Sequence, residues 1–204
     1  SAKEQQRRGR ELSADEWLAI AESARSRGML FLLLTGGEPL IRPDFRYLLT
    51  ELKKMGLLVS VNTNGSLIDR DWLDFFKHEP PFRFNITLYG AEDAAYERLC
   101  SVPAFERVTS NIRALKQLGA DVKLNVSLTP YNAPDLEKIY AIAEKLKTPV
   151  QLATYMFPPL RRSEEMIGKN DRFTPQEAAR YSFAWDKLRF SPEMLHERAA
   201  AMRA

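Results

Sequence analysis

The chain has 204 residues, of which 45% are hydrophobic and 28% are charged, a balance typical of one globular domain of ordinary size. Its 30 basic and 27 acidic residues leave a net charge of only +3, dispersed along the chain, which excludes the concentrated basic surface of a nucleic-acid-binding protein. No apolar run approaches the roughly 18–20 residues that span a bilayer, and no signal peptide is visible. We therefore expect a cytoplasmic protein with no membrane and no nucleic-acid partner.

Cys100 is the only cysteine of the chain. A single thiol excludes a disulfide framework, a structural zinc site or an iron–sulfur cluster held by this chain alone, because each of these needs several ligands. Its place near the end of a predicted helix indicates a small packed side chain. The sequence therefore predicts no metal ligands.

Hydrophobic periodicity and capping residues predict an alternation of helices and strands. The first helix begins at a capping box on Ser13 and stops at Gly28. The elements that follow are strand 29–34, a helix that stops at 56, strand 57–62, helix 69–77, strand 82–88, a helical turn, helix 105–118, strand 122–128, helix 134–146 and strand 150–156. Thr174 and Ser191, each followed by proline, predict the starts of two further helices.

Five strands separated by helices favour an α/β fold of parallel βα units with right-handed crossovers. We divide the chain into a flexible N-terminal segment (1–12), a core (13–157), and a long loop with C-terminal helices (158–204). The irregular stretch 157–172 contains Pro-Pro, Arg-Arg and a glycine, and a long loop of this kind is typical of an active-site lid.

Two of the predicted strands alternate polar and apolar residues, which puts each kind on its own face. The polar residues, which we expect to line one concave lumen, are Arg83, Asn85, Thr87, Lys123, Asn125 and Ser127. The apolar residues, which we expect against the outer helices, are Phe82, Phe84, Ile86, Leu88, Val122, Leu124, Val126 and Leu128. A closed barrel normally fills its interior with branched apolar residues, so a polar lumen favours an open or partial barrel. A sheet exposed on one face is the alternative.

The string Thr35-Gly36-Gly37-Glu38-Pro39-Leu40 follows the first predicted strand. Two glycines let the backbone come close to a ligand, and the carboxylate of Glu38 then lies at the carboxyl end of the strand, where parallel barrels bind their ligands. A tight turn with a solvated glutamate is the alternative for a bare Gly-Gly-Glu.

The longer string Leu-Thr-Gly-Gly-Glu-Pro-Leu-x-Arg-x-Asp-Phe (34–45) resembles the radical S-adenosylmethionine (SAM) enzymes, in which this segment holds the methionine end of SAM. Segments 61–65, 86–90 and 125–129 are similar to later strand ends of the same family, and the resemblance runs from about Leu12 to Phe190. It implies a parallel partial (β/α)6 TIM-like barrel with five of six strands present. The first strand and the CxxxCxxC loop that holds the 4Fe-4S cluster are missing, so we expect an internal piece of a longer enzyme.

The resemblance also implies a set of SAM-binding residues. Glu38 would orient the ammonium group, Thr87 and Arg98 would contact the carboxylate or ribose, and Asn125 and Ser127 would lie near ribose and adenine. The full set that it implies for the cofactor is Gly36, Gly37, Glu38, Asn62, Asn64, Thr87, Arg98, Asn125 and Ser127. No residue is expected to act as a catalytic acid, base or nucleophile.

The function that the resemblance implies belongs to the longer enzyme. With an upstream 4Fe-4S cluster, SAM would be cleaved to methionine and a 5′-deoxyadenosyl radical that abstracts a substrate hydrogen, while this piece alone would be inactive. Leu88-Tyr89-Gly90, with Tyr96, is most similar to members that carry a SPASM auxiliary-cluster domain and modify peptides or proteins, so the partner is a small molecule or a peptide. The alternatives are another TIM-barrel enzyme that uses Glu38 as a base, and a cluster-free module that binds peptides.

A missing first strand leaves the edge of strand 29–34 unpaired. We expect that edge to be disordered, covered by a second copy of the chain, or paired with a rearranged N-terminal segment.

Overall fold

The computed structural model describes residues 11–154 and 173–201. Their strands form one five-stranded parallel sheet in sequence order. The strands are β1 (Phe31–Leu34), β2 (Leu58–Thr63), β3 (Arg83–Thr87), β4 (Val122–Ser127) and β5 (Val150–Ala153). This order and direction confirm the predicted parallel βα architecture.

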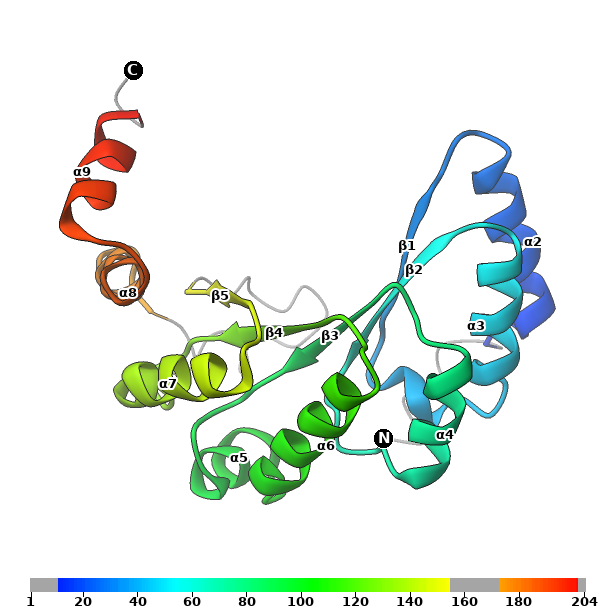
Figure 1. Cartoon of the computed structure of the whole chain (residues 1–204), viewed down its shortest axis with the longest axis horizontal. Helices are drawn as coiled ribbons and strands as arrows, with labels where there is room; N and C mark the ends of the chain where they lie inside the picture. The colour runs from blue at the N-terminus through cyan, green and yellow to red at the C-terminus, as the bar shows by residue number, and fades with distance from the viewer. Residues whose placement is uncertain (1–10, 155–172, 202–204) are drawn as a thin grey trace, which may run out of the picture.

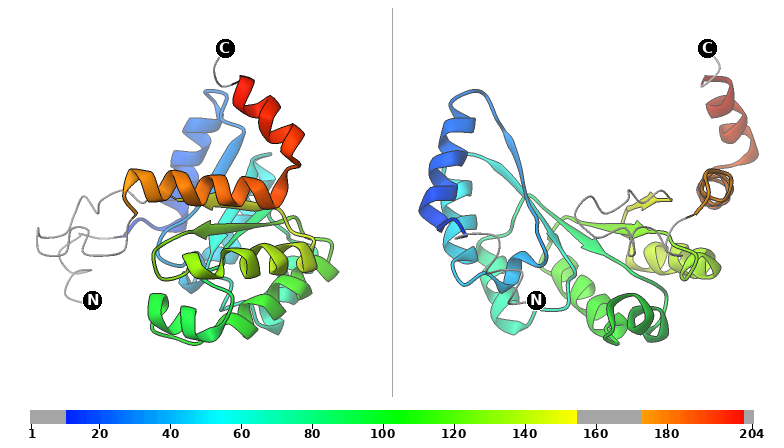
Figure 2. Two further views of the ribbon diagram at one scale, coloured as in Figure 1. Left: turned by 90° about the vertical axis from the view of Figure 1, so that its left-hand side faces the viewer. Right: turned by 180° about the vertical axis from the view of Figure 1, so that it is seen from behind.

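The helix before β1 and the helices between the strands lie on the convex side of the curved sheet (Figure 1). They are α2 (Ala14–Arg25), α3 (Phe45–Lys54), α4 (Arg70–His78), α5 (Asp93–Cys100), α6 (Phe105–Gln117) and α7 (Leu136–Leu146), with the short 3₁₀ helices η1 (Pro39–Ile41) and η2 (Ala133–Asp135). Beyond β5 follow α8 (Pro175–Arg189) and α9 (Pro192–Ala201), seen from behind in Figure 2. The concave side of the sheet carries none of the helices α2–α7.

Local sequence signals explain where these helices begin. Ser13 and Glu16 form the predicted capping box of α2, and Thr174 and Glu177 form a second one at α8. The C-terminal helix α8 packs on α7 through Trp185, whose ring lies edge-on to Tyr140 with centroids 5.7 Å apart. The predicted C-terminal helices are thus confirmed, while the expected lid loop falls within 155–172, outside the described residues.

The two faces of the sheet differ as predicted. Phe84, Ile86 and Leu124 are fully buried against the helix layer, because side chains alternate along a strand and these have the apolar register. The polar set lies on the opposite face, where Asn85 is in register with Lys123, and Thr87 with Asn125. One assignment was wrong: β3 begins at Arg83, so Phe82 precedes the strand, stays 43% exposed and packs edge-on against Phe31 rather than against the helices.

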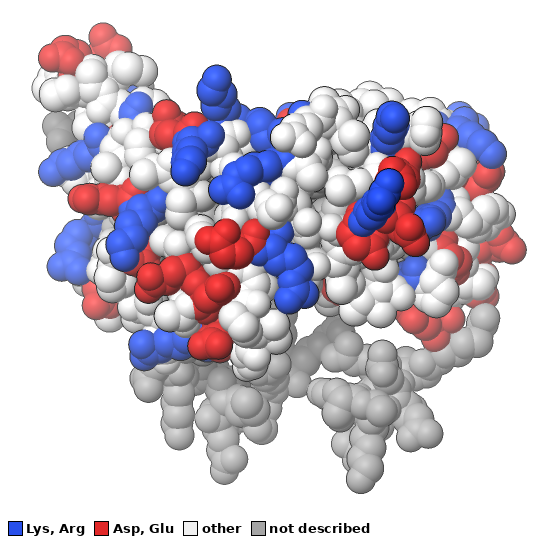
Figure 3. All heavy atoms as spheres, turned by 60° about the horizontal axis from the view of Figure 1, so that its bottom comes forward, with Lys and Arg blue, Asp and Glu red and all other residues white. Residues whose placement is uncertain are grey.

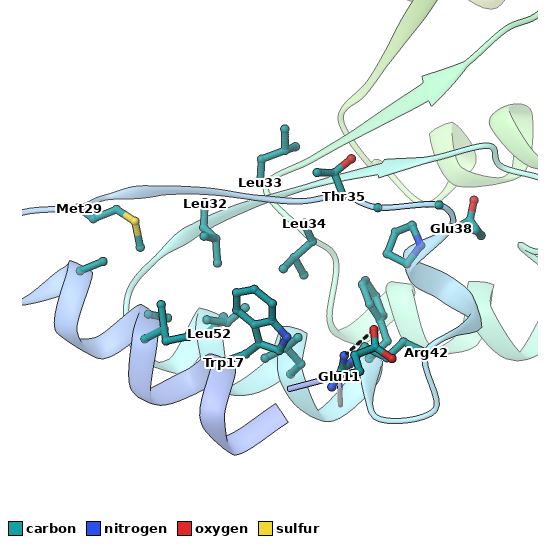
Figure 4. Close-up of a pocket in the computed structure, with 18 residues that line it drawn as sticks. Glu11, Trp17, Met29, Leu32, Leu33, Leu34, Thr35, Glu38, Arg42 and Leu52 are labelled. Carbon is teal, nitrogen blue, oxygen red and sulfur yellow. Dashed lines mark ion pairs between the residues drawn. The ribbon is translucent and has the colours of Figure 1, made fainter. Parts of the chain in front are cut away.

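One edge of β1 lacks a strand neighbour among the described residues, since β1 pairs there only with β2. Beside it, an apolar cavity of about 440 Å³ opens between β1, α2 and α3. Figure 4 shows Trp17 of α2, and Leu32 and Leu34 of β1, on the cavity side, whereas Leu33 points to the other face. The strand is regular, so the expectation of a disordered edge was wrong. Cover by a second copy or by the N-terminal segment stays a prediction.

Charges of both signs are mixed on the helix-covered face of the described chain. On the face drawn in Figure 3, Lys and Arg side chains are interspersed with Asp and Glu over the helix layer. In the described part of the chain, no helix has both the length and the apolar character needed to cross a membrane.

Candidate functional site at the carboxyl edge of the sheet

Glu38 joins the carboxyl ends of β1 and β2. Its Oε1 accepts hydrogen bonds from the Thr63 hydroxyl at 2.8 Å and from the Leu40 amide at 3.2 Å, and its Oε2 accepts one from the Asn64 amide at 2.8 Å. The side chain therefore fastens two strand ends, in contrast to the solvated glutamate of a simple turn. An ionised carboxylate has about four acceptor sites, so Glu38 can still accept a bond from a ligand.

The glycines before Glu38 leave open space beside this carboxylate. At both Gly36 and Gly37, no atom of the described chain lies within 4 Å of the position that a Cβ would occupy. Neighbouring side chains therefore do not demand glycine here, and the space is free for the close approach of a ligand to the backbone.

Asn64 lies at the edge as predicted, but most of its hydrogen-bonding capacity is used locally. Its Oδ1 accepts from the Ser66 amide at 2.8 Å and from the Ser66 hydroxyl at 2.6 Å, which fixes the turn after β2. Gly65 is required in that turn, since it has a φ of 73° and an added Cβ would lie 2.9 Å from Ile86. The Asn64 amide nitrogen is the part of the side chain that is left for a ligand.

The concave face below the edge contains amide groups with unused acceptors. Nδ2 of Asn85 donates to Oδ1 of Asn62 at 2.9 Å. This bond joins Asn62, predicted to bind the cofactor, to Asn85, predicted to line the lumen. The Oδ1 atoms of Asn85 and Asn125 are buried and have no hydrogen-bond partner within the described residues. A buried unpaired acceptor costs about 1–3 kcal/mol, so both atoms indicate that a ligand or water belongs on this face.

Asn132 connects the ends of β3 and β4. It is fully buried, and its Nδ2 donates to the backbone carbonyls of Tyr89 and Ser127 at 2.9 and 3.1 Å. Its Oδ1 accepts from the amide and hydroxyl of Thr129 at 2.7 and 3.2 Å. Thr87 and Ser127 are the last residues of β3 and β4. The Asn132 amide therefore fixes the loops that follow these two predicted residues.

Arg98, predicted to contact SAM, is held against the loop after β4. Its guanidinium carbon lies 4.2 Å from the centroid of the Tyr131 ring, a cation–π contact that joins α5 to the β4–α7 connection. The predicted residue thus lies near the carboxyl edge, with its position set by an aromatic ring that the sequence did not single out.

A second cavity, of about 190 Å³, opens at the same edge and contains a cation that the sequence analysis missed. Asn64, Tyr89, Tyr96 and Arg107 are among its lining residues, and none of its lining residues in the described chain is acidic. Arg107 lies in the first turn of α6, where the Phe105 amide already donates to the Asp93 carboxylate at 2.7 Å, so the positive charge in the cavity comes from the guanidinium of Arg107. This cavity is suited to an anionic group.

Tyr96 supports that interpretation. Its ring is almost completely buried, and its hydroxyl makes no hydrogen bond of good geometry with the described residues. Burial raises the pKa of this hydroxyl well above its usual range, so the group stays neutral and can act as a donor. Arg107 lies 20 positions after Thr87, the predicted site residue at the end of β3. Nothing in the sequence around Arg107 therefore marks it as a site residue.

Residues 1–146 match the profile of the family described as "Radical SAM superfamily". The chain belongs to the radical SAM superfamily. It is 26% identical to an AdoMet-dependent heme synthase of Methanosarcina barkeri over 83% of this chain and 48% of that protein. It is 31% identical to a probable GTP 3',8-cyclase of Saccharolobus solfataricus over 78% of this chain and 56% of that protein. This radical SAM chain therefore spans about half the length of these curated relatives.

Solved structures support the fold of this radical SAM chain. Streptococcus suis SuiB superimposes with a TM-score of 0.72 over 91% of this chain and 43% of its own, at 16% identity. The anSMEcpe enzyme with bound AdoMet gives a TM-score of 0.64 over 79% of this chain and 46% of its own, at 19% identity. At such identities the similarity shows the fold alone, the partial TIM barrel that the sequence predicted.

Radical SAM enzymes use SAM and a 4Fe-4S cluster, and the residues of this chain fit only the first of these. The carboxylate of Glu38, the unpaired amide acceptors and the cationic cavity match the ammonium, hydroxyl and carboxylate groups of SAM. The cluster has no ligand set here, since Cys100 is the only cysteine and the described residues contain no group of three or more His, Cys, Asp or Glu able to hold a metal.

Proposed function

We propose that this chain is the SAM-binding barrel of a larger radical SAM enzyme and is inactive by itself. The observation that carries the proposal is that Asn64 contacts one charged residue and shares a cavity with another of opposite sign. Its backbone amide donates to the carboxylate of Glu38, and its residue also lines the cavity that contains Arg107. A carboxylate and a guanidinium near the same residue complement the ammonium and carboxylate of an amino-acid zwitterion, and charge-assisted hydrogen bonds of this kind are stronger than neutral ones.

Each residue of the site has its own part in holding SAM. Glu38 binds the ammonium group, Arg107 binds the carboxylate, and Arg98 adds positive charge from the neighbouring helix. The backbone at Gly36 and Gly37 lies against the methionine part, while the ribose and adenine meet polar groups of Asn62, Thr87, Asn125 and Ser127. When bound beside a reduced cluster, SAM supplies the 5′-deoxyadenosyl radical, and the role of this chain is to hold and orient SAM.

The proposal is tested by comparing two ligands with the full-length enzyme in calorimetry. SAM carries the zwitterion on a sulfonium, whereas methylthioadenosine keeps the adenosine and a neutral thioether sulfur without the amino-acid part. We expect SAM to bind at least tenfold more tightly, and the difference to shrink in a Glu38→Gln, Arg107→Met double variant. Equal affinities of the wild-type protein for both ligands would contradict the proposed zwitterion site.

Inactivity of the chain alone is tested by anaerobic reconstitution with iron and sulfide. We expect no stoichiometric cluster and no SAM cleavage, because one thiol cannot replace the three that the site needs. A stoichiometric cluster on the 204-residue chain would contradict this part of the proposal.

The family match argues against the alternative of an unrelated TIM-barrel enzyme that uses Glu38 as a base. It does not identify the substrate. The relatives act on different molecules, as the names GTP 3',8-cyclase and heme synthase show, and SuiB and anSMEcpe were solved with peptides. We propose a small molecule or a peptide as the substrate, bound on the concave face, and the chemistry of that face narrows the choice.

A further inference from the structure

The concave face has a cavity of its own toward the amino ends of the strands. It measures about 240 Å³, and β1, β2, β3 and β4 all contribute to its lining. Leu33 and Ser60 line it from β1 and β2, Arg83 and Asn85 from β3, and Lys123 from β4. The cavity is therefore polar on one side and apolar on the other.

Its charge is positive. The guanidinium of Arg83 is neutralised by Asp121, with Nη2 and Oδ2 2.7 Å apart. The ammonium of Lys123 has a neutral partner instead, the amide oxygen of Gln151 at 2.7 Å. None of the cavity's lining residues in the described chain is acidic, so Lys123 is a cation without a counter-ion in the lining.

Asn85 provides an independent sign of a ligand. Its side chain is only 8% exposed, and its Nδ2 is used by Asn62, but its Oδ1 has no partner in the described chain. Asn85 and Lys123 are in register on neighbouring strands and lie on the same face, so an unpaired acceptor and an uncompensated cation line one cavity. A ligand that satisfies both carries an anionic oxygen for Lys123 and an N–H or O–H donor for Asn85.

The position of this cavity along the strands sets its distance from the carboxyl edge. Asn85 and Lys123 come two residues before Thr87 and Asn125 on the same strands, a separation of about 7 Å along the sheet. We propose that the cavity binds a carboxylate or phosphate group of the substrate at Lys123, while an N–H or O–H donor of the same substrate bonds to Oδ1 of Asn85, so that the substrate extends about 7 Å or more from that anion to its reacting atom. Anion binding is a property of this chain alone, and its assignment to the substrate rests on the proposed function.

The test uses the 204-residue chain in two NMR titrations, one with inorganic phosphate and one with acetate. We expect saturable shifts of the Lys123 signals with both anions, and of the Asn85 side-chain amide with phosphate, whose protonated oxygen can donate to Oδ1 of Asn85. The tighter anion identifies the group. Lys123→Met is expected to weaken binding at least tenfold, and Lys123→Arg to keep it within about threefold. Lys116→Met is the matched control, because Lys116 lies on α6 and donates to the Lys147 carbonyl, away from this cavity.

Three outcomes overturn the proposal. These are the absence of saturable binding of either anion at concentrations well above the millimolar range, an equal loss in Lys116→Met, and full binding by Lys123→Met. If Lys123→Met does not fold, Asn85→Asp replaces it. The new carboxylate beside Lys123 should abolish anion binding while Asn85→Ser retains it, and retained binding by Asn85→Asp overturns the proposal.

SAM binding by the full-length enzyme, measured in parallel, separates this inference from the proposed function. Intact SAM binding without anion binding by the chain refutes the anion site alone. Intact anion binding with equal affinities for SAM and methylthioadenosine refutes the proposed SAM site, and the cavity is then an anion site without an assigned substrate.

Discussion

The carboxylate of Glu38 accepts a hydrogen bond from the hydroxyl of Thr63 at 2.8 Å, across the gap between the loop after β1 and the end of β2. The bond connects residues 25 positions apart, and Thr63 is almost fully buried at 4% exposure. Glu38 therefore combines a structural contact with the proposed contact to SAM. Substituting Glu38 and Thr63 one at a time separates the contribution of this bond to stability from the contribution of Glu38 to SAM binding.

Glu38→Gln should weaken SAM binding by roughly ten- to a hundredfold in the full-length enzyme, because a charge-assisted contact of about 1.5–3 kcal/mol is lost. Thr63→Val keeps the carboxylate and should leave SAM affinity nearly unchanged, while lowering the free energy of unfolding by about 1 kcal/mol. Calorimetry with SAM and urea unfolding measure the two effects. SAM affinity that is unchanged in Glu38→Gln would remove Glu38 from the site.

Arg107→Met should weaken SAM binding at least tenfold, since the guanidinium is the cation of the second cavity at the carboxyl edge. Arg113→Met is the control, because Arg113 is an exposed arginine of the same helix that does not line that cavity. Arg98→Met, which removes the cation stacked on Tyr131, should weaken SAM binding less than Arg107→Met does. Equal SAM affinities of the Arg107 and Arg113 variants would exclude Arg107 from the site.

Asn132→Ala should lower the free energy of unfolding by about 2–3 kcal/mol, because it leaves two partly buried bonds to carbonyls and one buried bond to the Thr129 amide unmade. Asn111→Ala, which removes a single bond to the Gly65 carbonyl, should cost about 1 kcal/mol. Urea unfolding of both variants tests the difference. A smaller loss for Asn132 than for Asn111 would show that the β3–β4 loops hold their positions without this amide.

The free energy of unfolding should decrease as pH rises above about 9. Burial raises the pKa of the Cys100 thiol and of the Tyr96 hydroxyl above their ordinary values of 9.0 and 10.0, so both groups release their protons more readily in the unfolded chain. Their stabilising contribution is complete below those ordinary values and is lost as pH rises through the folded values. Tyr96→Phe and Cys100→Ala should each flatten the curve between pH 8 and 11 in urea unfolding, and curves parallel to the wild type would refute the assignment.

We propose that the chain self-associates through the open edge of β1. Phe31 and Leu33 are 63% and 47% exposed on this strand, and an apolar strand edge is a template for pairing with another chain. Phe31→Lys should reduce the weight-average mass in sedimentation experiments at high concentration, since a lysine on an edge strand opposes pairing. Phe183→Lys, at a comparably exposed position on α8, should leave the mass unchanged, and equal effects of both substitutions would indicate general hydrophobic association.

The order of the elements, their parallel direction and the two faces of the sheet followed from the sequence alone. These features depend on short-range rules, because a period of two fixes the face of a strand residue and a capping box fixes the start of a helix. The Gly-Gly-Glu string likewise placed Glu38 at the carboxyl end of β1, since the motif and the strand are adjacent in the chain. The prediction that Phe82 packs against the helices was wrong, because an error of one residue in a strand boundary moves a side chain out of the alternating pattern.

Only the tertiary structure decided which polar groups meet and which remain free. The side-chain oxygen of Asn64 accepts hydrogen bonds from Ser66. The side-chain nitrogen of Asn85 donates to Asn62, while the side-chain oxygen of Asn85 has no partner in the described chain. Arg107 reaches the cavity beside Asn64 because the turn after β2, the loop after β3 and the start of α6 converge there. The contacts of Asn85 with Asn62 and of Arg107 with the cavity beside Asn64 join residues more than 20 positions apart. Their geometry depends on strand register and loop packing, which the pattern of residue types in a single sequence does not specify.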